Sequence, residues 1–199
     1  DAAEAGAGAG PVVLLVDTSG SMIPSYAVLR RQVRKRLDAA ASRGAAFAIV
    51  GAGDGKAVAF RPDPADPAAV IAAPTAAAVA LAHEFLDDLL PNGTEGVPAG
   101  LAAAAALRPG VVWLVTDGWL DPGSGAAAAV AEAARQRRFR LSVLVHRPTR
   151  ERPAVEGWAV SDPALAAAAE ATGGACFWVD DDGAVERWTP ARAATRPGR

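Results

Sequence analysis

Short apolar runs alternate with amphipathic stretches along most of this chain. Runs rich in Val, Leu and aromatic residues are typical of strands in a parallel sheet that is covered on both faces. They predict strands over residues 12–16, 45–51, 56–61, 110–117, 139–146 and 175–179. Apolar residues at helical spacing predict helices over residues 25–42, 75–90, 96–107, 126–138 and from 162 to the Gly173-Gly174 pair.

The order of these elements predicts an α/β fold. Strand–helix alternation is typical of a doubly wound, three-layer α/β/α sandwich around a mostly parallel sheet, here six-stranded and Rossmann-like. A Gly/Asp turn joins residues 45–51 to 56–61, which indicates a hairpin and one antiparallel edge strand. One domain is expected over residues 11–180, between a flexible Ala/Gly linker (1–10) and a polar, basic tail (181–199).

Composition narrows the functional classes. The chain has 199 residues, 51% of them hydrophobic and 21% charged, with a net charge of −2. A globular domain is therefore expected, and nothing in the charge favours nucleic acid as a partner. Cys176 is the single cysteine, which excludes an internal disulfide and a Cys-rich metal site. No apolar run reaches the roughly 18–20 residues that insert across a bilayer.

Two predicted strands end on acids, Asp17 and Asp117. Such acids lie side by side when their strands flank the switch point of a doubly wound sheet. With Ser19, Ser21 and Thr94 they form a cluster of oxygen donors. Hard oxygen ligands favour Mg²⁺, Mn²⁺ or Ca²⁺ over zinc or copper, so a divalent cation, Mg²⁺ first, is the expected cofactor.

The same residues carry a resemblance to a known family. DTSGS at residues 17–21 resembles the DxSxS motif of the von Willebrand factor type A domain, also called the integrin inserted-domain fold. Thr94 in NGTEG and the Thr116-Asp117-Gly118 segment resemble the second and third metal-site loops of that family. EATGGACFWV at 170–179 resembles its final helix–strand junction, so the likeness covers residues 11–179.

The resemblance implies a metal-ion-dependent adhesion site. Ser19 and Ser21 then bind the cation directly, and Thr94 binds it directly or through water. Asp17 and Asp117 act largely through water or orient the other ligands. The open coordination position takes a carboxylate from an Asp or Glu of a partner protein. The rim that contacts this partner is expected at Met22, Ile23, Glu95 and Trp119.

A non-enzymatic protein-binding module is the leading interpretation. One alternative is a subunit of a chelatase-like or MoxR-type, ATPase-coupled complex. A magnesium-dependent phosphatase is less favoured, because Ser19 stands where a second acid is needed, and His83 and His146 form no Ser-His-Asp set. The Ala/Arg/Gly/Pro-rich composition indicates a bacterial source. Because the chain begins at Asp1, we expect an excised or processed chain. The favoured location is extracytoplasmic or membrane-tethered through a segment outside this sequence, with a cytoplasmic location left open.

Overall fold

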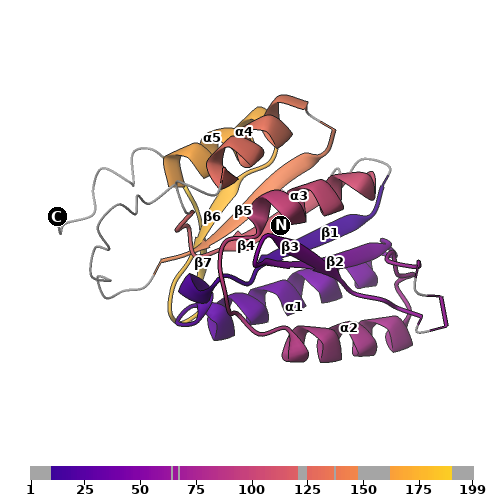
Figure 1. The fold of residues 1–199 in the computed structure, drawn as a ribbon. Helices are drawn as coiled ribbons and strands as arrows, with labels where there is room; N and C mark the ends of the chain where they lie inside the picture. Colours follow the sequence, from indigo (N-terminus) through magenta and orange to yellow (C-terminus); the bar gives the residue numbers. More distant parts are fainter. Residues whose placement is uncertain are drawn as a thin grey trace.

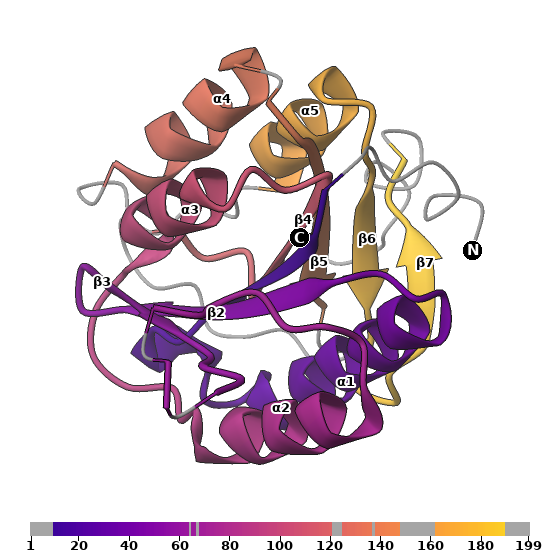
Figure 2. The ribbon, with the colours of Figure 1, turned by 90° about the vertical axis from the view of Figure 1, so that its right-hand side faces the viewer.

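A seven-stranded sheet runs through the middle of the molecule, with helices on both faces (Figures 1 and 2). The structure is a computed structural model that describes residues 10–63, 65–66, 68–120, 125–136, 138–147 and 162–189. The strands are β1 (Val12–Asp17), β2 (Phe47–Gly53), β3 (Lys56–Ala59), β4 (Val111–Thr116), β5 (Arg140–His146), β6 (Cys176–Val179) and β7 (Val185–Arg187). The helices are α1 (Tyr26–Ser42), α2 (Ala76–Asp88), α3 (Val97–Ala106), α4 (Ala126–Gln136) and α5 (Asp162–Ala171).

The strand order β3-β2-β1-β4-β5-β6-β7 places β1 inside the sheet, between β2 and β4. β1 pairs in parallel with β2 on one side and β4 on the other, with Val16 opposite Gly51 and Val115. The chain therefore leaves β1 for one half of the sheet and returns through β4 to build the other half. This is the switch point where doubly wound sheets form ligand sites, at the carboxyl ends of the strands.

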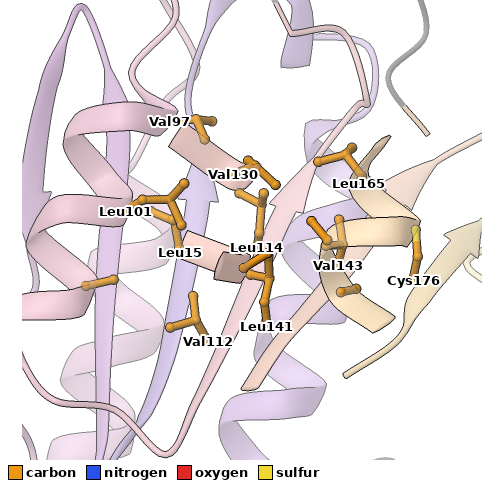
Figure 3. Close-up of a cluster of buried hydrophobic side chains, with 14 of the residues drawn as sticks. Leu15, Val97, Leu101, Val112, Leu114, Val130, Leu141, Val143, Leu165 and Cys176 are labelled. Atoms are coloured by element: carbon orange, nitrogen blue, oxygen red, sulfur yellow. The ribbon is translucent and has the colours of Figure 1, made fainter. Parts of the chain in front are cut away.

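Two apolar layers hold the helices to the sheet, because successive side chains of a strand point to opposite faces. From β1, Val13 and Leu15 pack with α3, α4 and α5, while Leu14 and Val16 pack with α1 and α2. Figure 3 shows part of the first layer, in which Leu15, Leu101 and Leu114 lie together. Burial of both faces explains the unbroken apolar runs from which the strands were predicted.

The predicted elements are confirmed, with helix ends that shift by one or two residues. The 45–61 hairpin is present as β2 and β3, which pair in an antiparallel manner. Residues 1–9 of the linker, residues 148–161 between β5 and α5, and residues 190–199 of the tail lie outside the described residues. In the described part of the chain, no helix is long and apolar enough to cross a membrane.

The sheet has one strand more than predicted. β7 pairs antiparallel with β6, so both edges of the sheet are antiparallel, and the folded unit continues beyond residue 180 to the buried Trp188. The connecting turn is closed by the Asp180 carboxylate, which accepts a 2.8 Å hydrogen bond from the Ala184 amide, and by Gly183 at φ 84°. β7 is three residues long and exposed, so it carries no hydrophobic period that could reveal it.

Candidate metal site

The first loop of the site leaves the sheet at Asp17, the last residue of β1. The Ser19 amide donates a 2.9 Å hydrogen bond to Oδ1 of Asp17, which turns the chain back over the carboxylate. A 3-10 turn, η2 (Gly20–Met22), follows before α1. In this conformation the hydroxyl oxygens of Ser19 and Ser21 lie 3.1 Å apart. Two hydroxyls are thus held side by side above a buried acid.

The neighbouring strand β4 holds the other oxygen of the same carboxylate. The Thr116 hydroxyl donates a 2.9 Å hydrogen bond to Oδ2 of Asp17, and it accepts a 3.2 Å bond from the Gly118 amide. Asp17 is fully buried, so water does not reach its carboxylate. Each of the two carboxylate oxygens accepts a hydrogen bond from the protein instead. The Asp17 side chain is therefore held by residues at the ends of two neighbouring strands, β1 and β4.

Burial also raises the pKa of Asp17. Desolvation, then the negative charge of Glu95 and more weakly that of Asp117, raise the pKa of Asp17 from 3.8 to about 7. The hydrogen bonds from Ser19 act in the opposite direction. A positive charge placed near this carboxylate is expected to favour its ionised form.

The third loop follows β4 and is ordered by Asp117. This residue is 3% exposed, and its Oδ1 accepts a 3.1 Å hydrogen bond from the Trp119 amide. The turn seen at Asp17, in which the carboxylate accepts the amide two residues further on, is thus repeated at Asp117, directly after β4. The turn brings the half-buried Trp119 ring to the wall of the site.

The second loop, residues 92–95, connects α2 to α3 and is attached to the first. The Asn92 amide donates to the Thr18 carbonyl at 2.8 Å, and the Gly20 amide donates to the Gly93 carbonyl at 3.0 Å. Glu95 closes the loop, because its Oε1 accepts hydrogen bonds of 2.9 and 2.8 Å from the first amides of the following helix. A carboxylate at a helix N-terminus is favoured by the helix dipole.

The turn between β2 and β3 holds this second loop from the other side. Oδ1 of Asp54 accepts a 2.8 Å hydrogen bond from the Thr94 amide, and the Thr94 hydroxyl lies 3.4 Å from the same oxygen. The Asp54 amide in turn donates to the Thr94 carbonyl at 2.9 Å. The Asp-Gly pair in the sequence signals a hairpin turn, but it does not reveal what the turn contacts.

The three loops enclose a pocket with a volume of about 160 Å³. Its lining comprises Ser19, Gly20, Ser21, Gly93, Thr94, Glu95 and Trp119. The hydroxyl-bearing residues of the predicted ligand set therefore share one pocket, whereas Asp17 and Asp117 are buried behind its lining. This arrangement offers a hard cation neutral oxygen atoms at the surface and negative charge underneath.

The residues expected at the rim separate into three groups. Glu95 and Trp119 line the pocket, and Ile23 is 63% exposed beside the first loop. Met22 is fully buried among residues of α1 and α2, so its prediction as a rim residue is wrong. The 3-10 turn explains the difference, because it directs Met22 towards the core and leaves the next residue in solvent.

Among the described residues, carboxylates, histidines and cysteines do not make a metal site by themselves. In the part of the chain that the structure describes, no group of three or more His, Cys, Asp or Glu is arranged to hold a metal ion. A cation in this pocket would therefore depend on hydroxyl oxygens and water for most of its contacts. Two residues to which the sequence assigns no role contribute through hydrogen bonds: Asp54 contacts Thr94, and Thr116 contacts the buried carboxylate of Asp17.

Known proteins resemble this chain in structure and not detectably in sequence. No protein-family model matches it, and no curated protein does. A von Willebrand factor type A protein from Catenulispora acidiphila is 21% identical over 86% of this chain and 39% of its own, with a TM-score of 0.60. The pilus adhesin SpaC from Lactobacillus rhamnosus GG is 12% identical over 87% of this chain and 29% of its own, with a TM-score of 0.59.

A third solved structure is similar in length to this chain. The SpRpn10 VWA domain is 12% identical over 86% of this chain and 87% of its own, with a TM-score of 0.51. The first two structures are much longer, and this chain spans well under half of each. At these identities the similarity shows a shared fold.

Proposed function

We propose, from the premise that this chain has the von Willebrand factor type A fold, that it is a non-enzymatic protein-binding module. A divalent cation, Mg²⁺ first, is held in the pocket by Ser19, Ser21 and Thr94, with Asp17 and Asp117 behind them. The cation binds a carboxylate of an acidic residue on a partner protein. The observation that carries this proposal is the pair of serine hydroxyls held 3.1 Å apart over a buried carboxylate.

The spacing of these hydroxyls fits an octahedral cation. Ligands about 2.1 Å from Mg²⁺ are about 3.0 Å from their neighbours in a regular octahedron. The oxygen atoms of Ser19 and Ser21 are 3.1 Å apart, so they match one edge of such a shell without rearrangement. Thr94 lines the same pocket and supplies a third hydroxyl from the opposite loop.

The electrostatics of the site also fit a cation. Asp17 is buried, and Glu95 and Asp117 add negative charge near it, which raises its pKa to about 7. A divalent cation above Ser19 and Ser21 would offset this repulsion and keep Asp17 ionised. When bound, the cation supplies a positive centre that accepts a carboxylate oxygen. The chain's own residues orient the hydroxyls and leave the pocket open to the partner.

The size and opening of the pocket support capture of a side chain. A volume of about 160 Å³ has room for several waters, each of which takes about 30 Å³ in the liquid, or for a carboxylate side chain beside the cation. Trp119 and Glu95 form its wall, and an interfacial tryptophan is a common binding anchor. SpaC, which shares the fold, is named a pilus adhesin, which agrees with a binding role.

Binding, not catalysis, is proposed because the histidines are engaged away from the pocket. His83 Nε2 lies 2.9 Å from Asp38 Oδ1, between α2 and α1. His146 is 2% exposed, and its Nε2 lies 3.2 Å from Asp181 Oδ1. Neither histidine lines the pocket that contains the serine hydroxyls. Because Ser19 also stands where a magnesium-dependent phosphatase needs a second acid, assays with generic phosphate esters and Mg²⁺ are expected to show no turnover above background.

Calorimetric titration with Mn²⁺ tests the metal site directly. The wild-type chain should bind one Mn²⁺, and Asp17→Ala should abolish binding. Asp66→Asn is a matched control, because Asp66 is exposed in the loop that rejoins the sheet at Phe47, at the other end of β2. Equal Mn²⁺ binding by wild type and Asp17→Ala would exclude the assigned site.

Selection from a random peptide library in Mn²⁺ tests the partner chemistry. The selected peptides should contain Asp or Glu, lose binding when that acid is changed to its amide, and dissociate in EDTA. Peptides that remain bound in EDTA, or that contain no acid, would contradict metal-dependent capture of a carboxylate.

A further inference from the structure

We propose that Asp54 is a positioning residue of the metal site, which holds Thr94 so that its hydroxyl presents lone pairs to the cation. This inference rests on the proposed function and deepens it. It gives a role to the GAGDGK segment, which resembles a phosphate-binding loop only superficially because Ala57 stands where a Ser or Thr should bind magnesium.

The backbone of the β2–β3 turn explains how Asp54 reaches the site. Asp54 and Gly55 both have positive φ, 52° and 64°, as expected for the two central residues of a tight hairpin turn. Asp tolerates this left-handed conformation better than most residues. Because β2 lies next to β1, the turn emerges at the same edge of the sheet as Asp17. The hairpin thereby brings a carboxylate beside the second loop.

Hydrogen bonds join this turn to the second loop in both directions, two of them between backbone groups and one to the Asp54 side chain. The Asp54 amide donates to the Thr94 carbonyl at 2.9 Å, and the Gly55 amide donates to the Glu95 carbonyl at 3.0 Å. The Thr94 amide donates back to Asp54 Oδ1 at 2.8 Å. Thr94 is therefore held at its amide and its carbonyl by one residue, although its own side chain is exposed.

The carboxylate of Asp54 is also restricted by close packing against Gly93. A β-carbon on Gly93 would lie 1.9 Å from Asp54 Oδ1, so the carboxylate packs directly against the backbone of the loop. On its other side the Gly93 carbonyl accepts a 3.0 Å hydrogen bond from the Gly20 amide of the first loop. The second loop is thus clamped between the β2–β3 turn and the loop that carries Ser19 and Ser21.

Hydrogen-bond chemistry connects this clamp to the cation. A threonine hydroxyl has one proton and two acceptor lone pairs. The Thr94 hydroxyl donates a 3.4 Å hydrogen bond to Asp54 Oδ1. The lone pairs are then left for the cation in the pocket that Thr94 lines. Partners that orient a ligand in this way change metal affinity by about 10–100-fold when they are removed.

Two substitutions distinguish the effect of the Asp54 carboxylate from the effect of the backbone conformation of the turn. Asp54→Gly removes the carboxylate and keeps a residue that adopts positive φ without strain, whereas Asp54→Asn keeps an oxygen acceptor at the same place. In calorimetric titrations with Mn²⁺ alone, Asp54→Gly should lose about 10-fold or more in affinity, and Asp54→Asn should recover most of that loss. The charge control is Asp66→Asn, which should bind like the wild type.

A double-mutant cycle shows whether Asp54 acts through Thr94. In a Thr94→Val background the hydroxyl is absent, so Asp54→Gly should cause little further loss of Mn²⁺ affinity. An equal loss in both backgrounds would overturn the inference, because Asp54 would then act through charge or general stability. An increase in affinity on Asp54→Gly would overturn it too, since Asp54 would then compete with the cation for the hydroxyl.

Hydrogen exchange of the Thr94 amide gives a readout that needs no metal. In EDTA this amide should exchange several-fold faster in Asp54→Gly than in the wild type, and Asp54→Asn should retain most of the protection. If the wild type binds Mn²⁺ but Asp54→Gly changes neither affinity nor exchange, only this inference fails. If the wild type binds no Mn²⁺, the proposed function fails, and the cation-directed role of Asp54 fails with it.

Discussion

The Thr116 hydroxyl donates a 2.9 Å hydrogen bond to Oδ2 of Asp17 across neighbouring strands, although the two residues are 99 positions apart in the sequence. This bond joins the first and third loops of the candidate site beneath its surface. Because Oδ1 of the same carboxylate accepts the Ser19 amide, the Ser19-Ser21 segment is tied through Asp17 to β4. A substitution at the end of β1 or of β4 should therefore shift the positions of the Ser19 and Ser21 hydroxyls.

Removal of the Thr116 hydroxyl should weaken both the fold and the metal site. Thr116→Val leaves a buried carboxylate oxygen without its hydrogen bond, which costs about 1–3 kcal/mol of unfolding free energy. Mn²⁺ affinity should fall by about 10-fold or more, because Asp17 loses one of its two anchors. Urea unfolding and calorimetry measure the two effects. Thr116→Ser keeps the hydroxyl and is expected to behave nearly like the wild type.

The stability of the metal-free protein should fall as pH rises from 5 to 7. The pKa of Asp17 is about 7 when folded and 3.8 ordinarily, so between these values the folded chain holds a proton that the unfolded chain releases. The stabilisation is complete below about pH 4 and is lost towards pH 7, by at most about 1.4 kcal/mol per pH unit. Urea unfolding in EDTA at pH 5, 6 and 7 measures this slope.

Asp17→Asn is the test of that assignment, since an amide does not titrate in this range. The slope between pH 5 and 7 should flatten in this variant and persist in Asp66→Asn. An unchanged slope in Asp17→Asn would mean that another group is responsible.

Cys176 should be inert towards thiol reagents in the folded protein. It is 3% exposed at the start of β6, and burial raises the pKa of its thiol to about 12. Only the thiolate reacts, so labelling by a disulfide reagent at pH 8 should be negligible until urea unfolds the chain. Ser42→Cys places a thiol on the exposed end of α1 and should label rapidly. Equal labelling rates for the two thiols would contradict the buried position of Cys176.

Gly96 should not accept a side chain, for reasons of space. A β-carbon there would lie 2.2 Å from the amide nitrogen of Gly53, at the junction between α3 and β2. Gly96→Ala should therefore reduce the unfolding free energy by about 3 kcal/mol or more, through overpacking. At Gly44 there is open space but φ is 73°, so Gly44→Ala tests backbone strain alone and should cost about 1 kcal/mol. Similar losses in the two variants would argue against the close contact.

Much of the fold was predictable because its signals are local. The apolar run of β1 stops at Asp17, and the run of β4 stops one residue before Asp117, so both strand ends can be recognised without a structure. The Asp-Gly pair marks the hairpin turn for the same reason. β7 escaped prediction because three exposed residues carry no hydrophobic period.

The proposed metal ligands include residues that the local sequence brings together and one that only the tertiary structure brings to the site. Ser19 and Ser21 follow Asp17 in a single short loop, so their proximity is a property of the local sequence. Thr94 reaches the same pocket only because α2 and the second loop return to the end of β1, as the hydrogen bond from Asn92 to Thr18 shows. Met22, one residue further along the first loop, was wrongly expected at the rim because periodicity does not reveal which way a 3-10 turn faces.

The sequence by itself determined the strands, the hairpin and the oxygen-bearing residues that follow β1, since each depends on a few neighbouring residues. Only the tertiary structure decided which strands are adjacent, and therefore that Thr116 holds Asp17 and that Asp54 holds Thr94. Those hydrogen bonds join residues far apart in the chain, and no period or spacing in the sequence encodes them. They follow from the packing of two apolar layers, which brings β2, β1 and β4 side by side in the sheet.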